Sequence, residues 1–532
     1  MPWLLAAEAD QIQDLIFRSS RLREVVGGSQ LLSRFCREGA PALLARHDGE
    51  TEDLIVNDGG AFRIRFASED QAISFGEDLA ELYRCTVGGN LTVAAPVEWQ
   101  DNNENSFTEA NAASQEALRE AKSRGDVPAA SAHLPHIAFC ASCGLALSFW
   151  HGVRHEDDRP NYLCIDCMSK NLERDWGTGG SLDSLRQAVA PDLSRAERGD
   201  WAEAIGELDL TGRRYVAYLL ADGNGMGRTF NRCRNSSAMT RLSDSLREIV
   251  IGSLAAPCRP LLARMREAEK NRVLPVVPLI LGGDDLFALL PASWSIDLAR
   301  RFCSEYERRM AQTLHELHLA DASPTVAAAV VICKANYPHA LAHRRGEALL
   351  QQAKRLARSL ETDTDETRRR RASVVNFAVI TGHDVDSDAA LTVTPCFTET
   401  SGPEGLSAAL FIHHRRQLAR NLPGKRRAEF RSLFDETMSE EPPDRARTWD
   451  PGCKILLHRL SGLGSATETK ELVRQALEDL GRPANEPGQP FYWRSFHRPE
   501  GTGFWANGFA DLLEIWDYSY DVTVTLSEYE DL

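Results

Sequence analysis

The tetrad Gly-Gly-Asp-Asp at residues 282–285 constrains this chain more than any other feature of its sequence. It lies between two short apolar runs, 277–281 and 286–290, and this pattern predicts a β-hairpin with two carboxylates just past its tip. The glycines permit a tight turn and allow a phosphate to approach the backbone. Adjacent aspartates at a hairpin tip need solvent or a cation to balance their charge, so a divalent metal carrying a nucleoside triphosphate suits the motif. A solvated turn is the alternative, because Gly-Gly-Asp also occurs in ordinary loops.

A further carboxylate precedes this tetrad in the chain. Residues 215–221 form an apolar run typical of a buried strand, and Asp222 follows it with a glycine-rich turn, Gly-Asn-Gly-Met-Gly, that leads into a helical pattern. A carboxylate at a strand end beside a helix N-terminus offers one metal ligand and several backbone N–H groups for phosphates. Sixty positions separate Asp222 from Gly282, enough for a helical crossover between neighbouring strands. We therefore expect the two motifs to meet at one sheet edge, as two-metal nucleotidyl transfer requires.

Together with a helix that ends Glu-Ala-Leu-Leu-Gln-Gln-Ala-Lys at residues 347–354, these motifs resemble a known Palm domain. It is the Palm of the large polymerase/cyclase-like subunit of type III CRISPR effector complexes, which is related to GGDEF-type nucleotide cyclases. Members of that family make cyclic oligoadenylates from ATP when the complex recognises target RNA. The resemblance implies the same activity here, with other effector subunits, guide RNA and target RNA as partners.

The resemblance also assigns roles to individual residues. It implies that Asp222, Asp284 and Asp285 are catalytic and hold Mg²⁺ or Mn²⁺ in a two-metal site. It implies that ATP is bound by Gly223, Asn224, Gly225, Gly227, Arg228, Gly282, Gly283 and Lys354. Asn224 stands where many relatives carry a second carboxylate, so the ligand set differs there. For Lys354 the alternative is a helix lysine that faces solvent.

The same order of motifs recurs near the N-terminus. A strand over 4–10 ends at Asp10, a hairpin surrounds Gly59-Gly60, and the segments 91–95 and 116–122 resemble 324–328 and 347–354. Alignment of the two copies puts Ala61-Phe62 where the second copy has Asp284-Asp285. We therefore expect a first Palm-like domain with an incomplete metal site, which packs and positions rather than catalyses.

Four cysteines between the two copies predict a second kind of metal site. Cys140 and Cys143 form one Cys-x-x-Cys pair, and Cys164 and Cys167 form another after twenty intervening residues. This spacing is typical of tetrahedral structural zinc, and a complete four-thiolate shell leaves no open position for catalysis. Disulfides are the alternative, but they are disfavoured in a chain without a signal peptide. Histidines that lie nearby as possible substitute ligands are His133, His136, His151 and His155.

Length and charge are consistent with a large intracellular assembly component. At 532 residues the chain predicts three or four domains, and its formal charge of −16 argues against non-specific binding of nucleic acid over the whole surface. No apolar run reaches transmembrane length and no signal sequence opens the chain, so we expect a cytoplasmic protein without a membrane partner.

The expected fold class is α+β, with two ferredoxin-like Palm domains, a zinc-binding helical insert and a C-terminal helical domain. The predicted boundaries are 1–100 for the first Palm, 101–210 for the insert, 211–385 for the catalytic Palm and 386–532 for the helical domain. The segment 361–371 is expected to be a charged loop. An N-terminal HD nuclease domain, which many relatives carry, is not expected, because His47-Asp48 and His383-Asp384 are isolated pairs.

Basic residues cluster in the C-terminal region at 413–416, 420 and 425–427. Two interpretations stay open for them, a nucleic-acid or partner-binding face and a solvated basic helix. Trp493, Trp505 and Trp516 are expected in the core or at a subunit interface. For the whole chain, three functions remain: the cyclase, a non-catalytic scaffold of the same complex, and a free-standing nucleotide cyclase. The paired aspartates favour an enzyme, because a scaffold gains nothing from crowded carboxylates.

Overall fold

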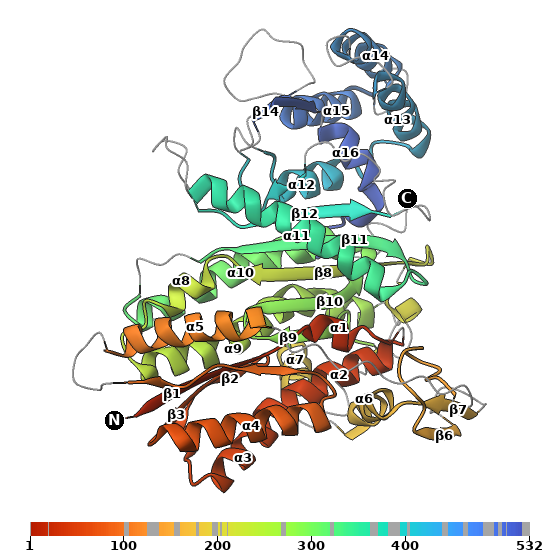
Figure 1. Ribbon diagram of the computed structural model, residues 1–532. Coiled ribbons are helices and arrows are strands. Elements are labelled where there is room, and N and C mark those ends of the chain that lie inside the picture. Colours follow the sequence, from red (N-terminus) through yellow and green to blue (C-terminus); the bar gives the residue numbers. More distant parts are fainter. Residues whose placement is uncertain are drawn as a thin grey trace.

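The computed structural model describes most of the chain, with gaps. The described residues are 2–19, 21–99, 106–124, 138–153, 160–176, 180–193, 201–202, 205–209, 211–267, 273–319, 324–361, 371–380, 394–401, 405–438, 445–460, 466–481, 494–497, 503–506 and 508–523. Most of the expected loop at 361–371 lies outside these residues, as do His383-Asp384 and Trp493. Figure 1 shows three tiers: an N-terminal sheet with its helices, a central sheet, and a bundle of C-terminal helices.

The central sheet forms the middle tier and has six strands in the order β13-β12-β11-β8-β10-β9. Its strands are β8 (Tyr215–Gly223), β9 (Val277–Gly282), β10 (Asp285–Pro291), β11 (Val326–Lys334), β12 (Val374–Val379) and β13 (Cys396–Phe397). The first four pair antiparallel, and β12 adds to β11 in parallel. The helices are α8 (Met226–Phe230), α9 (Ser236–Glu267), α10 (Ser295–Glu316) and α11 (His339–Glu361). The order β8-α9-β9-β10-α10-β11 is the ferredoxin-like βαββαβ pattern that we predicted.

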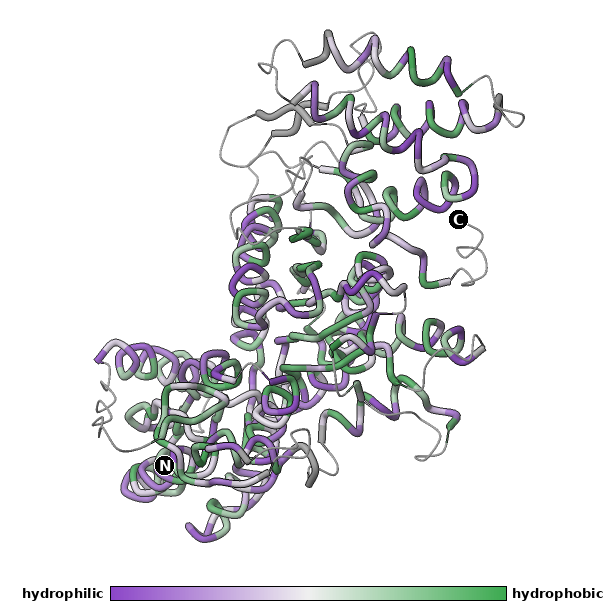
Figure 2. Tube along the Cα trace, turned by 90° about the vertical axis from the view of Figure 1, so that its right-hand side faces the viewer, coloured by the Kyte–Doolittle hydropathy of each residue, from purple (hydrophilic) through white to green (hydrophobic). Residues whose placement is uncertain are grey.

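The central strands are apolar along almost their whole length because both of their faces are covered. Every residue of Val326–Cys333 is buried, as is every residue from Val216 to Ala221. Tyr218 and Leu220 face α11, since the Tyr218 hydroxyl lies 2.8 Å from His339 Nδ1 and a β-carbon at Gly346 would overlap Leu220. Gly223 faces α10 instead, beside the hydroxyl of Tyr306. In Figure 2 green, apolar stretches run through the middle of the molecule.

The N-terminal sheet repeats this topology. Its strands are β1 (Trp3–Ala9), β2 (Leu54–Asp58), β3 (Ala61–Phe66) and β4 (Leu91–Val93) in the order β2-β3-β1-β4, and β5 (Val97–Glu98) also pairs with β1. Its helices are α1 (Ile12–Ile16), α2 (Leu22–Arg34), α3 (Ala40–Arg46) and α4 (Glu69–Thr86), with a π-helical turn at Phe35–Gly39 between α2 and α3. The equivalent order in the second copy is β9-β10-β8-β11, so the predicted pair of ferredoxin-like domains is confirmed.

Helix α5 (Ser106–Arg124) packs on the N-terminal sheet. Its residue Leu118 forms a small apolar cluster with Ala6 of β1 and with Ala94, which follows β4. The first Palm unit therefore extends to about residue 124, beyond the expected boundary at 100. The insert that follows has helices α6 (Ile165–Trp176) and α7 (Gly180–Val189) and also the hairpin β6 (Trp150–Val153) and β7 (Pro160–Leu163).

The C-terminal tier is mainly helical, as expected. It contains α12 (Ala408–Leu418), α13 (Gly424–Met438), α14 (Arg445–Leu460), α15 (Ala466–Gly481), α16 (Gly508–Glu514) and the hairpin β14 (Arg494–His497) and β15 (Gly503–Ala506). Among the helices that the structure describes, none is both long enough and apolar enough to cross a bilayer.

The basic cluster of α12 differs from both interpretations of the sequence, because each assumed that its side chains are exposed. Arg415 is buried, donates from Nε to the Trp516 carbonyl oxygen at 2.9 Å, and lies over the rings of Trp516 and Tyr520. Arg427 of α13 also stacks on Trp516, which is itself buried. Sequence alone did not show this, since the aromatic partners follow about a hundred residues later. Part of the cluster therefore holds the C-terminal helices together.

Candidate functional site

The tetrad forms the predicted hairpin at the edge of the central sheet. Gly282 pairs with Asp285, so Gly283 and Asp284 make a two-residue turn between β9 and β10. Gly283 has φ +59°, a left-handed conformation that glycine adopts without steric cost. Asp284 thus lies in the turn itself rather than past it, and Asp285 is the first residue of β10.

Strand alternation decides where the three carboxylates point. Leu286 pairs with Ala221, which puts Asp285 opposite Asp222, and residues opposite each other in antiparallel strands share a face. Both line a cleft on the α11 side of the sheet. Asp284 approaches from the other side, where a β-carbon at Gly223 would lie 3.1 Å from its Oδ2. The absence of a side chain at Gly223 therefore leaves room for the Asp284 carboxylate.

Lys354 of α11 completes the group. Its Nζ lies 2.6 Å from Asp222 Oδ2, and its side chain is only 15% exposed, so it is not a lysine that faces solvent. Lys354 lies two helical turns after Glu347 on α11, and Glu347 also lines the cleft. The structure thus brings Asp222, Asp285 and Lys354 together in the wall of the cleft, and Asp284 lies next to them on the other side of the sheet.

The carboxylates are electrostatically crowded despite this lysine. Burial, followed by the negative charge of Asp222, raises the pKa of Asp284 to about 6. The pKa of Asp285 is raised well above its usual range by desolvation, then by the charges of Asp284 and Asp222 and by a hydrogen bond with the Asp222 side chain. A cluster that resists carrying three negative charges by itself is suited to bind additional positive charge.

These carboxylates have the donor chemistry of a divalent-cation site, but among the described residues they do not form a group compact enough to share one metal ion. Asp222, Asp284 and Asp285 are hard oxygen donors of the type that Mg²⁺ and Mn²⁺ prefer. In this structure the ammonium of Lys354 provides the positive charge beside Asp222.

The glycine turn after β8 is placed less favourably than predicted. Gly225 has φ +73° and caps the five-residue helix α8, while the Asn224 backbone N–H and side chain both bond to Thr325. Arg228 is 66% exposed and pairs with Glu361 at 2.6 Å. Neither Arg228 nor the turn over 223–227 belongs to the wall of the cleft. Of the predicted nucleotide-binding residues, the cleft is lined by Gly282 and Lys354.

The cleft has a volume of about 1460 Å³ and runs between the two copies of the fold. The first copy contributes Glu8, Asp10, Asp58 and Lys122 to its wall. Lys122 Nζ lies 3.1 Å from Glu8 Oε2 and 4.0 Å from Asp10 Oδ1, which repeats the pairing of Lys354 with Asp222. The sequence had indicated Asp10 and the helix ending at Lys122, but not Glu8 or Asp58.

Strand pairing corrects our alignment of the two copies. In the first copy Asp58 pairs with Ala61 across the Gly59-Gly60 turn, and in the second copy Gly282 pairs with Asp285 across the equivalent turn. On the neighbouring strand Glu8 pairs with Ala61, and in the second copy Asp222 lies opposite Asp285. Glu8, rather than Asp10, therefore occupies the position of Asp222. Gly60-Ala61, rather than Ala61-Phe62, replaces the acidic pair 284–285. The first copy still lacks both tip carboxylates.

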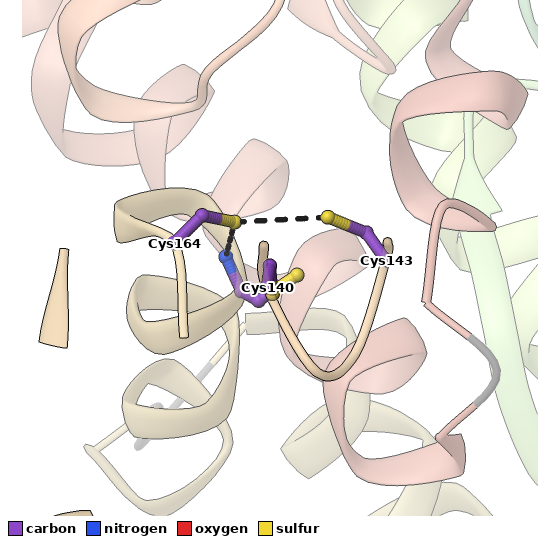
Figure 3. Close-up of side chains that lie close together, drawn as sticks. Cys140, Cys143 and Cys164 are labelled. Carbon is purple, nitrogen blue, oxygen red and sulfur yellow. Dashed lines mark hydrogen bonds between the residues drawn. The ribbon is translucent and has the colours of Figure 1, made fainter. Parts of the chain in front are cut away.

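The four cysteines of the insert converge as the sequence predicted. Their sulfur atoms all lie within 4.8 Å of one another, and among the described residues this is the one such group of His, Cys, Asp and Glu side chains. Figure 3 shows the sulfurs of Cys143 and Cys164 facing each other, 3.9 Å apart. A tetrahedral zinc site with Zn–S bonds of about 2.3 Å needs sulfurs about 3.8 Å apart, so the group fits zinc.

Thiol chemistry supports the same fit. Backbone N–H groups of Ser142 and Cys167 point at the sulfurs of Cys140 and Cys164, each at 3.4 Å. A hydrogen bond from Cys167 lowers the pKa of Cys164 to about 5, while the pKa of Cys167 is raised by that bond and by burial. Zinc would replace the shared protons, and with four thiolates its role would be structural.

Comparisons with known proteins agree with the fold, and one of them matches the segment that contains the central site. Residues 215–360 match the family model described as Cas10/Cmr2, second palm domain. Comparison with curated proteins found no match. Among solved structures the chain is similar to Csm1 of T. onnurineus, with 15% sequence identity and a TM-score of 0.54 over 98% of this chain and 70% of that chain.

More distant similarity extends to Csm1–Csm4 cassettes. One, solved in complex with one ATP, is 15% identical with a TM-score of 0.44 over 66% of this chain and 53% of that chain. Another, in complex with cA4, is 15% identical with a TM-score of 0.43 over 72% and 55%. The chain spans about half the length of these matched chains. The predicted resemblance of residues 215–360 to the Palm of the large subunit of type III CRISPR complexes is confirmed, and the rest of the described chain shares the Csm1 fold.

Proposed function

We propose that this chain is the large subunit of a cytoplasmic, RNA-guided type III CRISPR complex, and that its central sheet joins ATP molecules into cyclic oligoadenylates. The observation that carries the proposal is the convergence of Asp222, Asp285 and Lys354 in a cleft between two Palm folds, with the Asp284 carboxylate next to them. The site lies within the segment that matches the second palm domain of Cas10/Cmr2. Other effector subunits, guide RNA and target RNA are the partners that this assignment implies.

In each bond-forming step the 3′-hydroxyl of one adenylate would attack the α-phosphate of the next ATP, form a phosphodiester bond and release pyrophosphate. Attack by the last 3′-hydroxyl on the first α-phosphate would close the ring, break the bond from that phosphorus to the bridging oxygen and release the final pyrophosphate. Asp222, Asp284 and Asp285 would hold Mg²⁺ or Mn²⁺, which would neutralise charge on the reacting oxygens when bound.

The chain's own residues would do the positioning. Lys354, which already faces the cleft, would turn its ammonium from Asp222 to a phosphate oxygen once a divalent cation balances the carboxylate. Gly282 also lines the cleft, on the strand that leads into the Asp284 turn. The first Palm fold would supply the opposite wall, with Glu8 and Lys122 facing the substrate.

The test is product analysis with labelled ATP and Mn²⁺, using the purified chain alone and assembled with its partner subunits and target RNA. We expect pyrophosphate and cyclic adenylates in the assembled complex. ATP that lacks the 3′-hydroxyl is the matched control, since it should bind and give no ring. Absence of every adenylate product from the complete, RNA-bound complex would contradict the proposal.

A further inference from the structure

The turn that carries Asp284 is held from outside the central sheet. Asp58, the last residue of β2 in the first copy, accepts a hydrogen bond from the Gly283 backbone N–H through Oδ2 at 3.2 Å. No strand pairing uses this N–H, because Gly283 is in the two-residue turn. A carboxylate is a strong acceptor, so this bond fixes the Gly282–Gly283 peptide, which leads into the turn that carries Asp284.

The Asp58 carboxylate is itself held in a fork. Arg247 of α9 donates from Nη2 to Oδ1 at 2.5 Å and from Nε to Oδ2 at 3.2 Å. The Asp58 side chain is only 12% exposed and that of Arg247 is 31% exposed, so the carboxylate end of this bidentate ion pair is shielded from water. Both α9 and the Gly283–Asp284 turn belong to the second copy. Asp58, a residue of the first copy, therefore links these two parts of the second copy.

Backbone packing at the two hairpin tips leaves little freedom for this arrangement. A β-carbon at Gly282 would lie 3.0 Å from the Gly59 Cα, and one at Gly59 would lie 3.4 Å from the Gly282 carbonyl carbon. Asp58 occupies the position in the first copy that Gly282 occupies in the second. The first hairpin thus has no carboxylate in its turn, but it has Asp58 immediately before the turn. The Asp58 side chain contacts the turn of the second hairpin at Gly283.

We propose that Asp58 is a positioning residue: through the Asp58 carboxylate, fixed by Arg247, the first Palm fold holds the Gly283–Asp284 turn in its metal-binding conformation. This inference rests on the proposed function, because it gives that site a second, cross-domain support. Asp58 acts through the turn and does not itself contact the reacting atoms.

The first measurement is amide hydrogen exchange at Gly283 in the full chain, which needs no catalytic turnover. Loss of a hydrogen bond to a charged acceptor in Asp58→Ala should speed exchange about 10- to 100-fold. Asp58→Asn keeps an acceptor oxygen and should give a smaller increase. Asp53→Asn is the matched control, since Asp53 pairs with Arg65 in the same copy away from the cleft and should leave Gly283 unchanged.

The second measurement is Mn²⁺ affinity, compared in Asp58→Ala, Arg247→Met and Arg247→Lys. We expect affinity to fall about tenfold in the first two and to be partly restored by lysine. If Asp58 were instead a direct metal ligand, Arg247→Met would free its carboxylate and tighten Mn²⁺ binding, which would overturn the proposal. Unchanged Gly283 exchange and Mn²⁺ affinity in folded Asp58→Ala would overturn it as well.

In the active complex, Asp58→Ala should lower kcat more than it raises the KM for ATP, because substrate contacts remain while the catalytic turn loosens. Equal kcat values for wild type and Asp58→Ala would count against the proposal. A wild-type complex without any product would instead refute the proposed function, and the exchange and Mn²⁺ measurements would still decide the role of Asp58.

Discussion

Replacing Gly27 with alanine should loosen the four-cysteine insert from the first Palm fold, whereas the same change at Gly28 should not. Both glycines are buried in α2, which packs against α6 of the insert. A β-carbon at Gly27 would lie 1.7 Å from the Lys170 carbonyl oxygen, but one at Gly28 would lie 3.4 Å from the Lys170 side chain, an ordinary contact. We therefore expect alanine at these two adjacent positions of one helix to change the stability of the α2–α6 contact in opposite directions.

The magnitudes follow from two opposing effects. Glycine to alanine inside a helix normally stabilises by about 1 kcal/mol. At Gly27 the clash is with backbone, and α6 cannot retreat easily, because Cys164 and Cys167 hold its first turn and the Lys170 ammonium donates to the Leu15 carbonyl. Overpacking typically costs about 1–3 kcal/mol and occasionally more, and an approach of 1.7 Å to a backbone atom puts Gly27 at the upper end, at about 2–4 kcal/mol before that gain is subtracted. We expect Gly27→Ala to be destabilised by about 1–3 kcal/mol and Gly28→Ala to be stabilised by up to about 1 kcal/mol.

Hydrogen exchange of the α6 backbone is the appropriate assay, because a chain of several domains does not unfold in one global step. A loss of about 1–3 kcal/mol raises the opening equilibrium, and thus the exchange rate, about 5- to 150-fold in Gly27→Ala. Exchange in Gly28→Ala should be unchanged or slower. Equal exchange rates in the two variants would refute the packing argument.

Other parts of the molecule give equally specific expectations. Cys164→Ser should reduce copurified zinc from one ion per chain and speed exchange in the insert, since metal binding contributes folding free energy; a zinc-free native wild type would contradict this. Asp222→Ala should cost about 100-fold or more in turnover, whereas Glu8→Ala, at the equivalent place in the first copy, should cost less than about tenfold; equal and severe losses would mean that both copies are catalytic. Arg415→Met should destabilise the C-terminal helices by about 2–4 kcal/mol, because the buried Trp516 carbonyl loses its donor and the Trp516 ring loses its cation. Arg420 is exposed, so Arg420→Met should not change stability, and protease resistance compares the two variants. Similar resistance in both would show that the buried cation contributes little.

The sequence was sufficient for features that depend on local pattern. Apolar runs on both sides of residues 282–285 predicted β9 and β10, and the buried run before Asp222 predicted β8. The spacing of the two Cys-x-x-Cys pairs predicted their convergence. In each case neighbouring residues carry the signal, because strand period, turn chemistry and ligand spacing are local properties.

Features that depend on register or on distant partners were not accessible in this way. Glu8 and Asp10 are two residues apart and both lie near Lys122, so motif similarity could not tell which one matches Asp222. The contact of Asp58 with Gly283 joins residues 225 positions apart. Arg415 meets Trp516 from 101 positions away, which made a basic helix look solvated.

The central claim is that the hairpin at residues 282–285 is catalytic, and the turnover of an Asp284→Ala, Asp285→Ala double variant tests it most directly. Wild type and variant should be assembled with the same partner subunits, target RNA, labelled ATP and Mn²⁺, and their folding compared by circular dichroism. Removal of two ligands from a two-metal site should cost several kcal/mol of transition-state stabilisation, so we predict a loss of adenylate products of about a thousandfold or more. Undiminished product from the well-folded double variant would contradict the account.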